Sequence, residues 1–210
     1  MAPPPHGPIS ARRLLLLGAG IALLAAAWIG PLPALAMTRF WAHMTMHLAV
    51  VALAAPLIAA ALAGSRFDPV ARAPVLFAPL PAAFLEFVVI WGWHAPAAHD
   101  AARMRPEVFV VEQASFLGVG LLVWMSAIGG ARAGRRERAP GGVAALLLTA
   151  MHMSLLGALL ALAPRPLYEA CLGPDDQQIG GVMMLAVGGS VYLIGALVLL
   201  PRVLDEPARP

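Results

Sequence analysis

The sequence is poor in the residues that build soluble, disulfide-bonded or catalytic domains. Only 12% of its 210 residues are charged, lysine is absent, and there is a single cysteine. Because Cys171 has no second cysteine to pair with, a disulfide within the chain is excluded. No loop places a serine or cysteine beside a base, and no glycine run is built to hold a phosphate, so we expect a protein that is not an enzyme.

Long apolar runs take the place of the missing charge. Hydrophobic residues make up 60% of the chain, which is outside the range of ordinary soluble domains. A hydrocarbon core about 30 Å thick needs roughly 20 apolar residues per helix. The sequence therefore predicts an all-α, polytopic membrane bundle of about six transmembrane helices. The predicted spans are 12–30, 41–63, 74–93, 106–129, 141–163 and 178–201.

The predicted domain organisation is one transmembrane domain over 12–201, with tails at 1–11 and 202–210 that we expect to be disordered. The third span is the least regular, because Pro79 and Pro81 should kink it or delay its start. The first run also fits a cleaved secretory signal, with a basic start and a small-residue cleavage site at 34–36. Both interpretations place Met37 outside the membrane.

The arginines predict the orientation of the bundle. If the N-terminus is cytoplasmic, the outer segments hold four of the fourteen basic residues, namely Arg39, Arg103, Arg105 and Arg165, and the inner segments hold the other ten. The positive-inside rule favours this arrangement, with both termini in the cytoplasm. The net charge of +3 then reflects arginines that meet anionic membrane lipid, and no nucleic-acid partner is needed to explain it.

Several polar side chains interrupt the apolar runs near their predicted outer ends. Ionisable groups are costly in hydrocarbon, so each one is a candidate functional residue. His43 and His47 share one helix face because they are four residues apart. The full set of candidate metal ligands or supporting groups is His43, His47, His94, Glu112 and His152, with Gln178 and Glu86 as further members. Polar groups gathered at one level predict a pocket that opens to the outside.

A metal site is one function that this set could serve. His43 and His47, with His152 from another helix, could close on a single ion. Glu112 could act as a ligand, as the carboxylate that orients an imidazole, or as a proton carrier. The flanking methionines favour Cu(I), although methionine is also common packing in apolar helices. Each histidine taken alone is equally compatible with a structural role. We assign no functional role to His6 or His99.

A series of motifs resembles the multi-pass cytochrome c oxidase assembly factors of the CtaG family, over about residues 41–200. The motifs are His43-Met44-Thr45-Met46-His47, Ala55-Pro56-Leu57, Trp93-His94-Ala95-Pro96, Glu112-Gln113-Ala114-Ser115-Phe116-Leu117, Met151-His152, Leu155 to Leu160, Ala163-Pro164-Arg165-Pro166-Leu167-Tyr168, and Asp175 to Gly181. The resemblance implies a helical bundle in the bacterial inner membrane that assists oxidase maturation, at the step of copper insertion, with oxidase subunits as partners.

The chain departs from the family pattern at three positions. Relatives tend to carry histidines where this sequence has Phe109 and Gln113, and a tryptophan where it has Leu185. If those histidines bind copper in relatives, this chain has a smaller set of ligands.

Two other functional classes stay open. A haem-binding membrane protein could use His47 and His152 as axial ligands, although the further histidine pairs of a two-haem carrier are missing. A small ion or metal transporter would use the same polar residues as a path, but their pattern does not continue into the inner half. The sequence therefore favours an assembly factor with a copper-related role.

Overall fold

The computed structural model describes residues 10–130, 134–168 and 173–204, and within them the chain forms helices and connecting turns. The prediction of an all-α bundle is confirmed. The helices are α1 (Ala11–Ile29), α2 (Leu32–Ala36), α3 (Phe40–Leu48), η1 (Ala49–Ala54), α4 (Ala55–Leu62), η2 (Pro69–Ala71), α5 (Pro79–Trp93), α6 (Pro96–Met104), α7 (Pro106–Ile128), α8 (Arg135–Leu162), α9 (Pro174–Met183), η4 (Met184–Gly189), α10 (Ser190–Leu199) and α11 (Pro201–Leu204).

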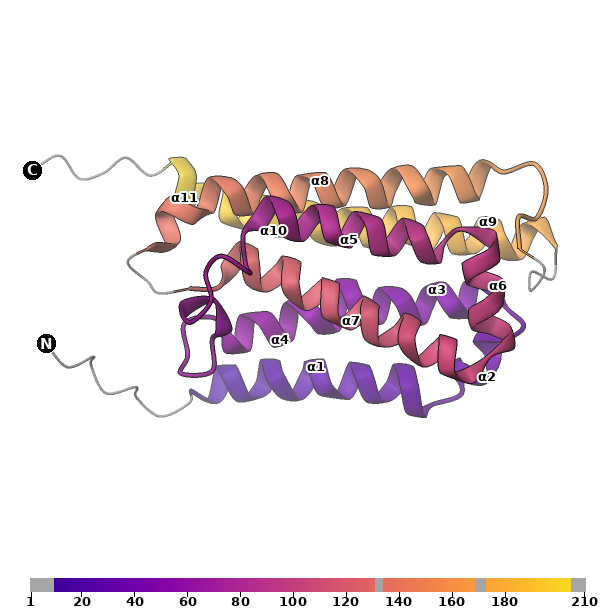
Figure 1. Cartoon of the computed structure of the whole chain (residues 1–210), viewed down its shortest axis with the longest axis horizontal. Coiled ribbons are helices and arrows are strands. Elements are labelled where there is room, and N and C mark those ends of the chain that lie inside the picture. Colours follow the sequence, from indigo (N-terminus) through magenta and orange to yellow (C-terminus); the bar gives the residue numbers. More distant parts are fainter. Residues whose placement is uncertain (1–9, 131–133, 169–172, 205–210) are drawn as a thin grey trace, which may run out of the picture.

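The long helices run side by side, and the chain passes back and forth along them (Figure 1). Five segments of the described chain are long and apolar enough to cross a membrane, and α5 is a shorter apolar helix of 15 residues. Because α4 ends at one end of the bundle and α7 begins at the other, α5 makes the passage between them (Figure 1). The described chain therefore begins and ends at the same end, which we call the terminal end; the opposite end, with α2 and α6, is the distal end.

Prolines set several helix starts. The third predicted span begins at Pro79 rather than at residue 74, because proline suits the first position of a helix, where an N–H would have no partner. The delayed start foreseen from the two prolines is thus confirmed. The helix over the fifth span begins at Arg135, with Pro140 inside it, and that over the sixth begins at Pro174, so both start earlier than expected.

A tryptophan side chain donates a hydrogen bond to a backbone carbonyl in the irregular middle of the α3–α4 span. The turn over η1 is π-helical, with the Ala55 N–H bonded to the Val50 carbonyl. Pro56, next in line, has no N–H to offer the Val51 carbonyl. Trp124 Nε1 donates to that oxygen instead, at 3.2 Å, and Tyr192 Oη lies at the same distance from it, with its proton directed to Glu86. This wider turn links the second span to α7 through a side-chain hydrogen bond and brings Tyr192 of α10 next to it.

Glycine allows the backbones of the fifth and sixth spans to approach closely. A Cβ at Gly157 would lie 2.6 Å from the Leu185 amide nitrogen, and one at Gly181 would collide with the Ala161 amide nitrogen. Close approach through small residues is a common way for membrane helices to pack.

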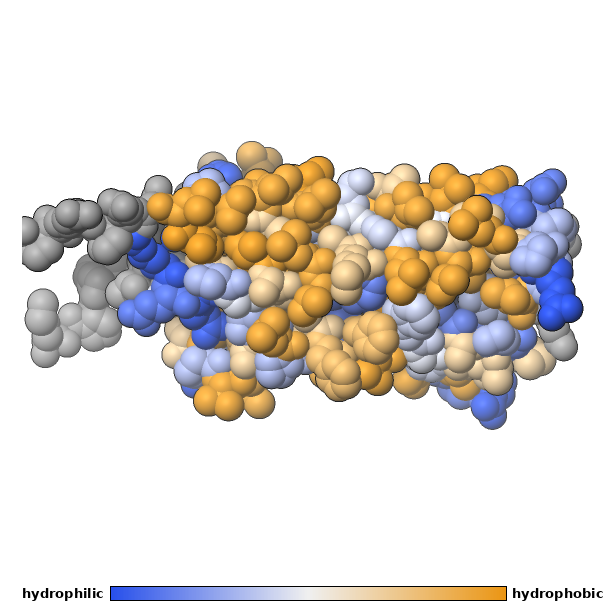
Figure 2. Space-filling model, turned by 90° about the horizontal axis from the view of Figure 1, so that it is seen from above, coloured by the Kyte–Doolittle hydropathy of each residue, from blue (hydrophilic) through white to orange (hydrophobic). Residues whose placement is uncertain are grey.

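The surface suits a membrane protein. In the view from above, hydrophobic residues cover the middle of the molecule and hydrophilic ones gather toward its two ends (Figure 2). Large apolar side chains on several helices are exposed, among them Leu15, Phe84, Leu162 and Val198. An apolar belt between polar ends is what a lipid bilayer requires of a multi-pass helical protein.

Candidate functional site

Four histidines and an ion pair gather inside the distal end of the bundle. They come from α3 (His43 and His47), the C-terminus of α5 (His94), α6 (His99 and Arg103) and α7 (Glu112), and each of these side chains is at most 6% exposed. We call these six residues the histidine cluster. α6, a short helix between Pro96 and Arg105, lies across this end of the bundle (Figure 1). Its buried residues, His99, Ala102 and Arg103, follow the spacing of one helix face.

A buried ion pair forms one side of the cluster. Arg103 Nη2 donates to Glu112 Oε2 at 2.6 Å, and Arg103 Nη1 donates to the Ala36 carbonyl at 3.2 Å. The Gln113 amide also donates to Glu112 Oε2, at 3.2 Å, while Glu112 Oε1 is buried without a hydrogen bond. An arginine and a carboxylate can stay charged in such a place only because they neutralise each other.

Gln113 connects this pair to the first helix. Its side-chain oxygen accepts a hydrogen bond from Trp28 Nε1, at 3.1 Å, while its amide nitrogen donates to Glu112. A chain of hydrogen bonds therefore runs from Trp28 in α1 through α7 to Arg103 in α6. At this departure from the family pattern, the glutamine serves as a structural link between helices.

Arg103 also fixes the tautomer of His43. Its Nη1 lies 2.8 Å from His43 Nδ1. Guanidinium nitrogens only donate, so His43 Nδ1 must accept, and a neutral imidazole then carries its proton on Nε2. That nitrogen is buried without a partner. As placed, His43 therefore presents an N–H rather than a lone pair to the interior of the cluster.

His94 has the opposite tautomer. Its Nδ1 lies 2.7 Å from the Ile90 carbonyl, which only accepts, so the proton is on Nδ1. Nε2 keeps a lone pair and is buried without a partner. Burial, which disfavours the charged imidazolium, lowers the pKa of His94 to about 4. A neutral imidazole held through Nδ1 by a carbonyl is the usual state of a metal-ligating histidine.

His47 stands next to His94 in the cluster. The two ring centroids are 5.4 Å apart, and the ring of Phe116 lies 4.4 Å from that of His47. Neither ring nitrogen of His47 has a hydrogen-bond partner, although the side chain is fully buried. Buried imidazole nitrogens nearly always have a partner. His47 and His94 thus form a pair of adjacent neutral rings with spare ligand capacity.

His99 completes the cluster, although no role was assigned to it from the sequence. Its ring lies 4.9 Å from the ring of His43 and 4.2 Å from that of Tyr168. Burial, followed by the positive charge of Arg103, lowers the pKa of His99 to about 2. From the sequence, His99 was interpreted as a loop histidine without a function. In the structure it lies on the inward-facing, polar side of α6.

Arg103 was likewise counted only as an outer-loop charge. A signal for both residues was present in the sequence: Pro96 and Pro106 bracket a short helix, and His99 and Arg103 are four residues apart within it. A search for apolar runs does not detect this helix, because α6 is too polar and too short to be predicted as a membrane span.

The remaining predicted site residues make other contacts, although His152 is near enough to His47 for their charges to interact. The ring of His152 packs against that of Phe87, 5.5 Å away, beside an apolar groove of α5 and α8. Glu86 accepts hydrogen bonds from Tyr192 Oη at 2.6 Å and Thr149 Oγ1 at 2.7 Å, a network separate from the cluster. Gln178 is half-buried, and the buried glutamine beside it, Gln177, donates to the Leu160 carbonyl.

The described part of the chain contains no group of three histidine, cysteine, aspartate or glutamate side chains arranged to hold one metal ion as it stands. The shared site of His43, His47 and His152 therefore stays a prediction. The expectations for Cys171 and His6 concern residues that lie outside the described part.

Comparison with protein families identifies the relatives of this bundle. The model of the family described as cytochrome c oxidase caa3 assembly factor (Caa3_CtaG) matches residues 4–206. The chain belongs to this family. The match confirms the resemblance inferred from the motifs and extends it to the first helix. No match was found among curated proteins or among solved structures.

Proposed function

We propose that this member of the Caa3_CtaG family assists assembly of cytochrome c oxidase by holding Cu(I) as cargo in the histidine cluster, on the outer side of the bacterial inner membrane. His47 and His94 are the proposed principal ligands. The observation that carries this proposal is the set of buried ring nitrogens without partners, on His47 and on Nε2 of His94. Imidazole nitrogen is a suitable ligand for copper, and the family description names the oxidase as the object of assembly.

The charge of the cluster fits a monovalent cargo. Arg103 and Glu112 neutralise each other, and the neutral histidines add no charge. A divalent ion would add two positive charges to a buried site that already holds Arg103, whereas Cu(I) adds one. Glu112 Oε1, buried without a partner, is the carboxylate oxygen that is free to face the ion.

His43 is the proposed third ligand, with its availability controlled by Arg103. While Arg103 donates to Nδ1, the proton of His43 stays on Nε2 and blocks that nitrogen. If Arg103 keeps only its bonds to Glu112 and Ala36, the proton can move to Nδ1 and free the Nε2 lone pair. This exchange offers a way to change the ligand number between loading and release without moving a helix.

Cu(I) retention by the purified protein in detergent tests the site. His47→Ala and His94→Ala should each abolish most retention, and His43→Ala should weaken it. Thr149→Val is the matched control, because it removes a buried polar group from the separate Glu86 network. His152→Ala tests the shared site predicted from the sequence. Retention that is unchanged in His47→Ala and His94→Ala would contradict the proposal.

Growth under copper limitation tests the role in the cell. A strain without this protein should contain oxidase with near-normal haem, reduced copper and low activity, and added copper should partly restore the activity. The reason is that copper insertion and haem insertion use different ligands and can fail separately. Fully active, copper-replete oxidase in the deletion strain would refute a delivery role.

A further inference from the structure

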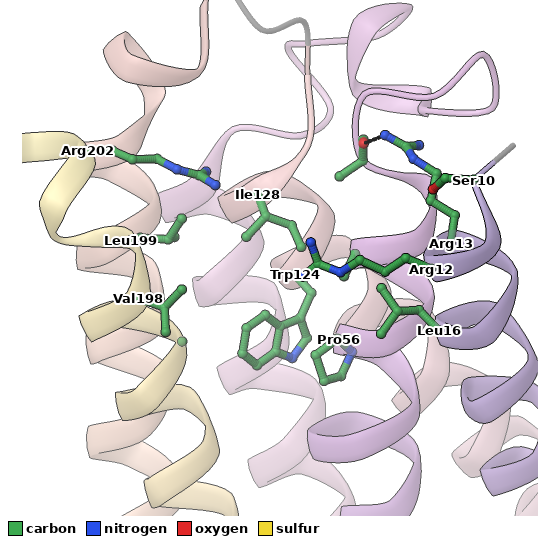
Figure 3. A pocket seen from close by; sticks show the side chains of 13 residues that line it. Ser10, Arg12, Arg13, Leu16, Pro56, Trp124, Ile128, Val198, Leu199 and Arg202 are labelled. Carbon is green, nitrogen blue, oxygen red and sulfur yellow. Dashed lines mark hydrogen bonds between the residues drawn. The ribbon is translucent and has the colours of Figure 1, made fainter. Parts of the chain in front are cut away.

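A cleft at the terminal end of the bundle combines arginines with an apolar floor. Its volume is about 470 Å³, within the usual range for ligand sites. α1 and α10 flank it, and residues of α4 and α7 form its floor, including Pro56, Trp124 and Ile128. Figure 3 shows Arg12 and Arg202 reaching toward each other from opposite sides, with Ile128 between them.

The three arginines of the cleft differ in their bonding. Arg13 donates to the carbonyls of Ala61 and Ala63, at 3.1 and 3.0 Å, and so caps the C-terminus of α4. Arg12 and Arg202 are exposed and make no hydrogen bond or ion pair with other described residues. No acidic side chain lines the cleft in the described part of the chain. Two guanidinium groups are therefore free to bind an anion at its mouth.

The walls show that the anion must carry an apolar part. Val198 of α10 is 68% exposed on the side of the helix that a bilayer would cover, and Leu16 of α1 faces the same cleft. The Trp124 ring lies on the floor because Gly195 leaves room for it: a Cβ there would lie 2.5 Å from Trp124 Cη2. A small soluble anion would leave these apolar walls unused.

We infer that this cleft is a binding site for one anionic phospholipid, with its phosphate between Arg12 and Arg202 and its acyl chains along Leu16, Trp124 and Val198. The location agrees with this ligand, because the arginine-rich end is the one predicted to face the cytoplasm, where the leaflet surface is negatively charged. The site is at the opposite end of the bundle from the histidine cluster and does not depend on copper.

Native mass spectrometry of the purified, delipidated full chain tests this site with phosphatidylglycerol, with phosphatidylcholine of the same acyl chains, and with inorganic phosphate. Phosphatidylglycerol should bind more tightly than phosphatidylcholine. Arg12→Gln and Arg202→Gln should each weaken it about fivefold, and together about 30-fold, which corresponds to about 1 kcal/mol per arginine near a membrane surface. Arg66→Gln, an exposed arginine of the same end outside the cleft, should leave binding unchanged.

A second variant separates shape from charge. Ala60 is exposed and lines the cleft, so Ala60→Phe should fill part of it and reduce retention of both lipids while all arginines remain. This variant still tests the site if the double arginine variant does not accumulate. Equal retention of the two lipids by the unaltered protein, or equal weakening by Arg66→Gln, would overturn the inference. Complete displacement of phosphatidylglycerol by inorganic phosphate at low millimolar concentration would also overturn it.

Discussion

Removing both members of the buried ion pair should cost less stability than the sum of the two single removals. In Arg103→Met, Glu112 loses its 2.6 Å partner and keeps only the Gln113 amide, although the carboxylate is fully buried. Isolating one charge of a buried pair typically costs about 3–5 kcal/mol. Arg103→Met should fall in this range, because it also removes the bonds to the Ala36 carbonyl and to His43.

Glu112→Gln should cost somewhat less than Arg103→Met. Arg103 would keep its neutral acceptors at Ala36 and His43, while the new amide preserves the volume of the carboxyl group. In the double variant, Arg103→Met with Glu112→Gln, no charge is left unpaired. Its loss of stability should therefore be smaller than the sum of the two single losses, by about 2–3 kcal/mol, the upper part of the range for directly interacting residues.

Unfolding in mixed micelles by increasing denaturing detergent measures the free energies of all four proteins, and membrane abundance gives a second readout. Ser126→Ala is a matched control, because Ser126 is a buried polar residue of α7 whose hydroxyl donates to the Leu122 carbonyl, away from the ion pair. Additive losses in the double variant would refute the reasoning. So would a cost below about 1 kcal/mol for Arg103→Met, the value typical of an exposed pair.

Three further predictions follow from the helix arrangement and the cluster. Reporter fusions after Arg136 should report the cytoplasm, and fusions after Arg103 or Asp175 the outside; the reverse pattern would turn the histidine cluster inward. Burial lowers the pKa of His94 from its ordinary 6.5 to about 4, so the unfolded chain binds more protons between these values and stability should fall as pH drops from 6.5 to 4, by about 3 kcal/mol. Thermal unfolding against pH checks this, and His94→Gln should make that part of the curve shallower while the fall contributed by His99 remains. Gly157→Ala should cost about 1–3 kcal/mol, since its Cβ would meet the backbone at Leu185, whereas Gly118→Ala in α7, with open space around it, should be tolerated.

Much of the fold was predictable from the sequence because the bilayer imposes a simple rule on it. A spanning helix must satisfy its own backbone and present apolar side chains for about 20 residues, so five spans could be located from hydropathy, and the short third one from hydropathy and its prolines. These five spans and the short third one together give an even number of passages. Helix ends were harder to predict. Pro79 and Pro174 begin helices at places where an average over neighbouring residues gives no sharp signal.

Part of the candidate site was also predictable, because ionisable residues in apolar runs are conspicuous. His43, His47, His94 and Glu112 were identified in this way, and the structure brings them together at the distal end. His99 and Arg103 were missed, because they lie in a polar segment that looks like a loop until it folds across the end of the bundle. Glu86 and His152 stood out by the same signal but lie in other surroundings, because helix rotation decides which neighbours a side chain meets.

The sequence by itself determined the class of protein, the number of passages and the family, because these depend on composition, on run length and on the order of short motifs. The tertiary structure alone decided which polar groups share a site. Arg103 lies sixty positions from His43 in the chain, yet its guanidinium holds that imidazole in one tautomer and neutralises Glu112. Such partnerships depend on how helices rotate and pack against one another, and no local pattern of residues records that rotation.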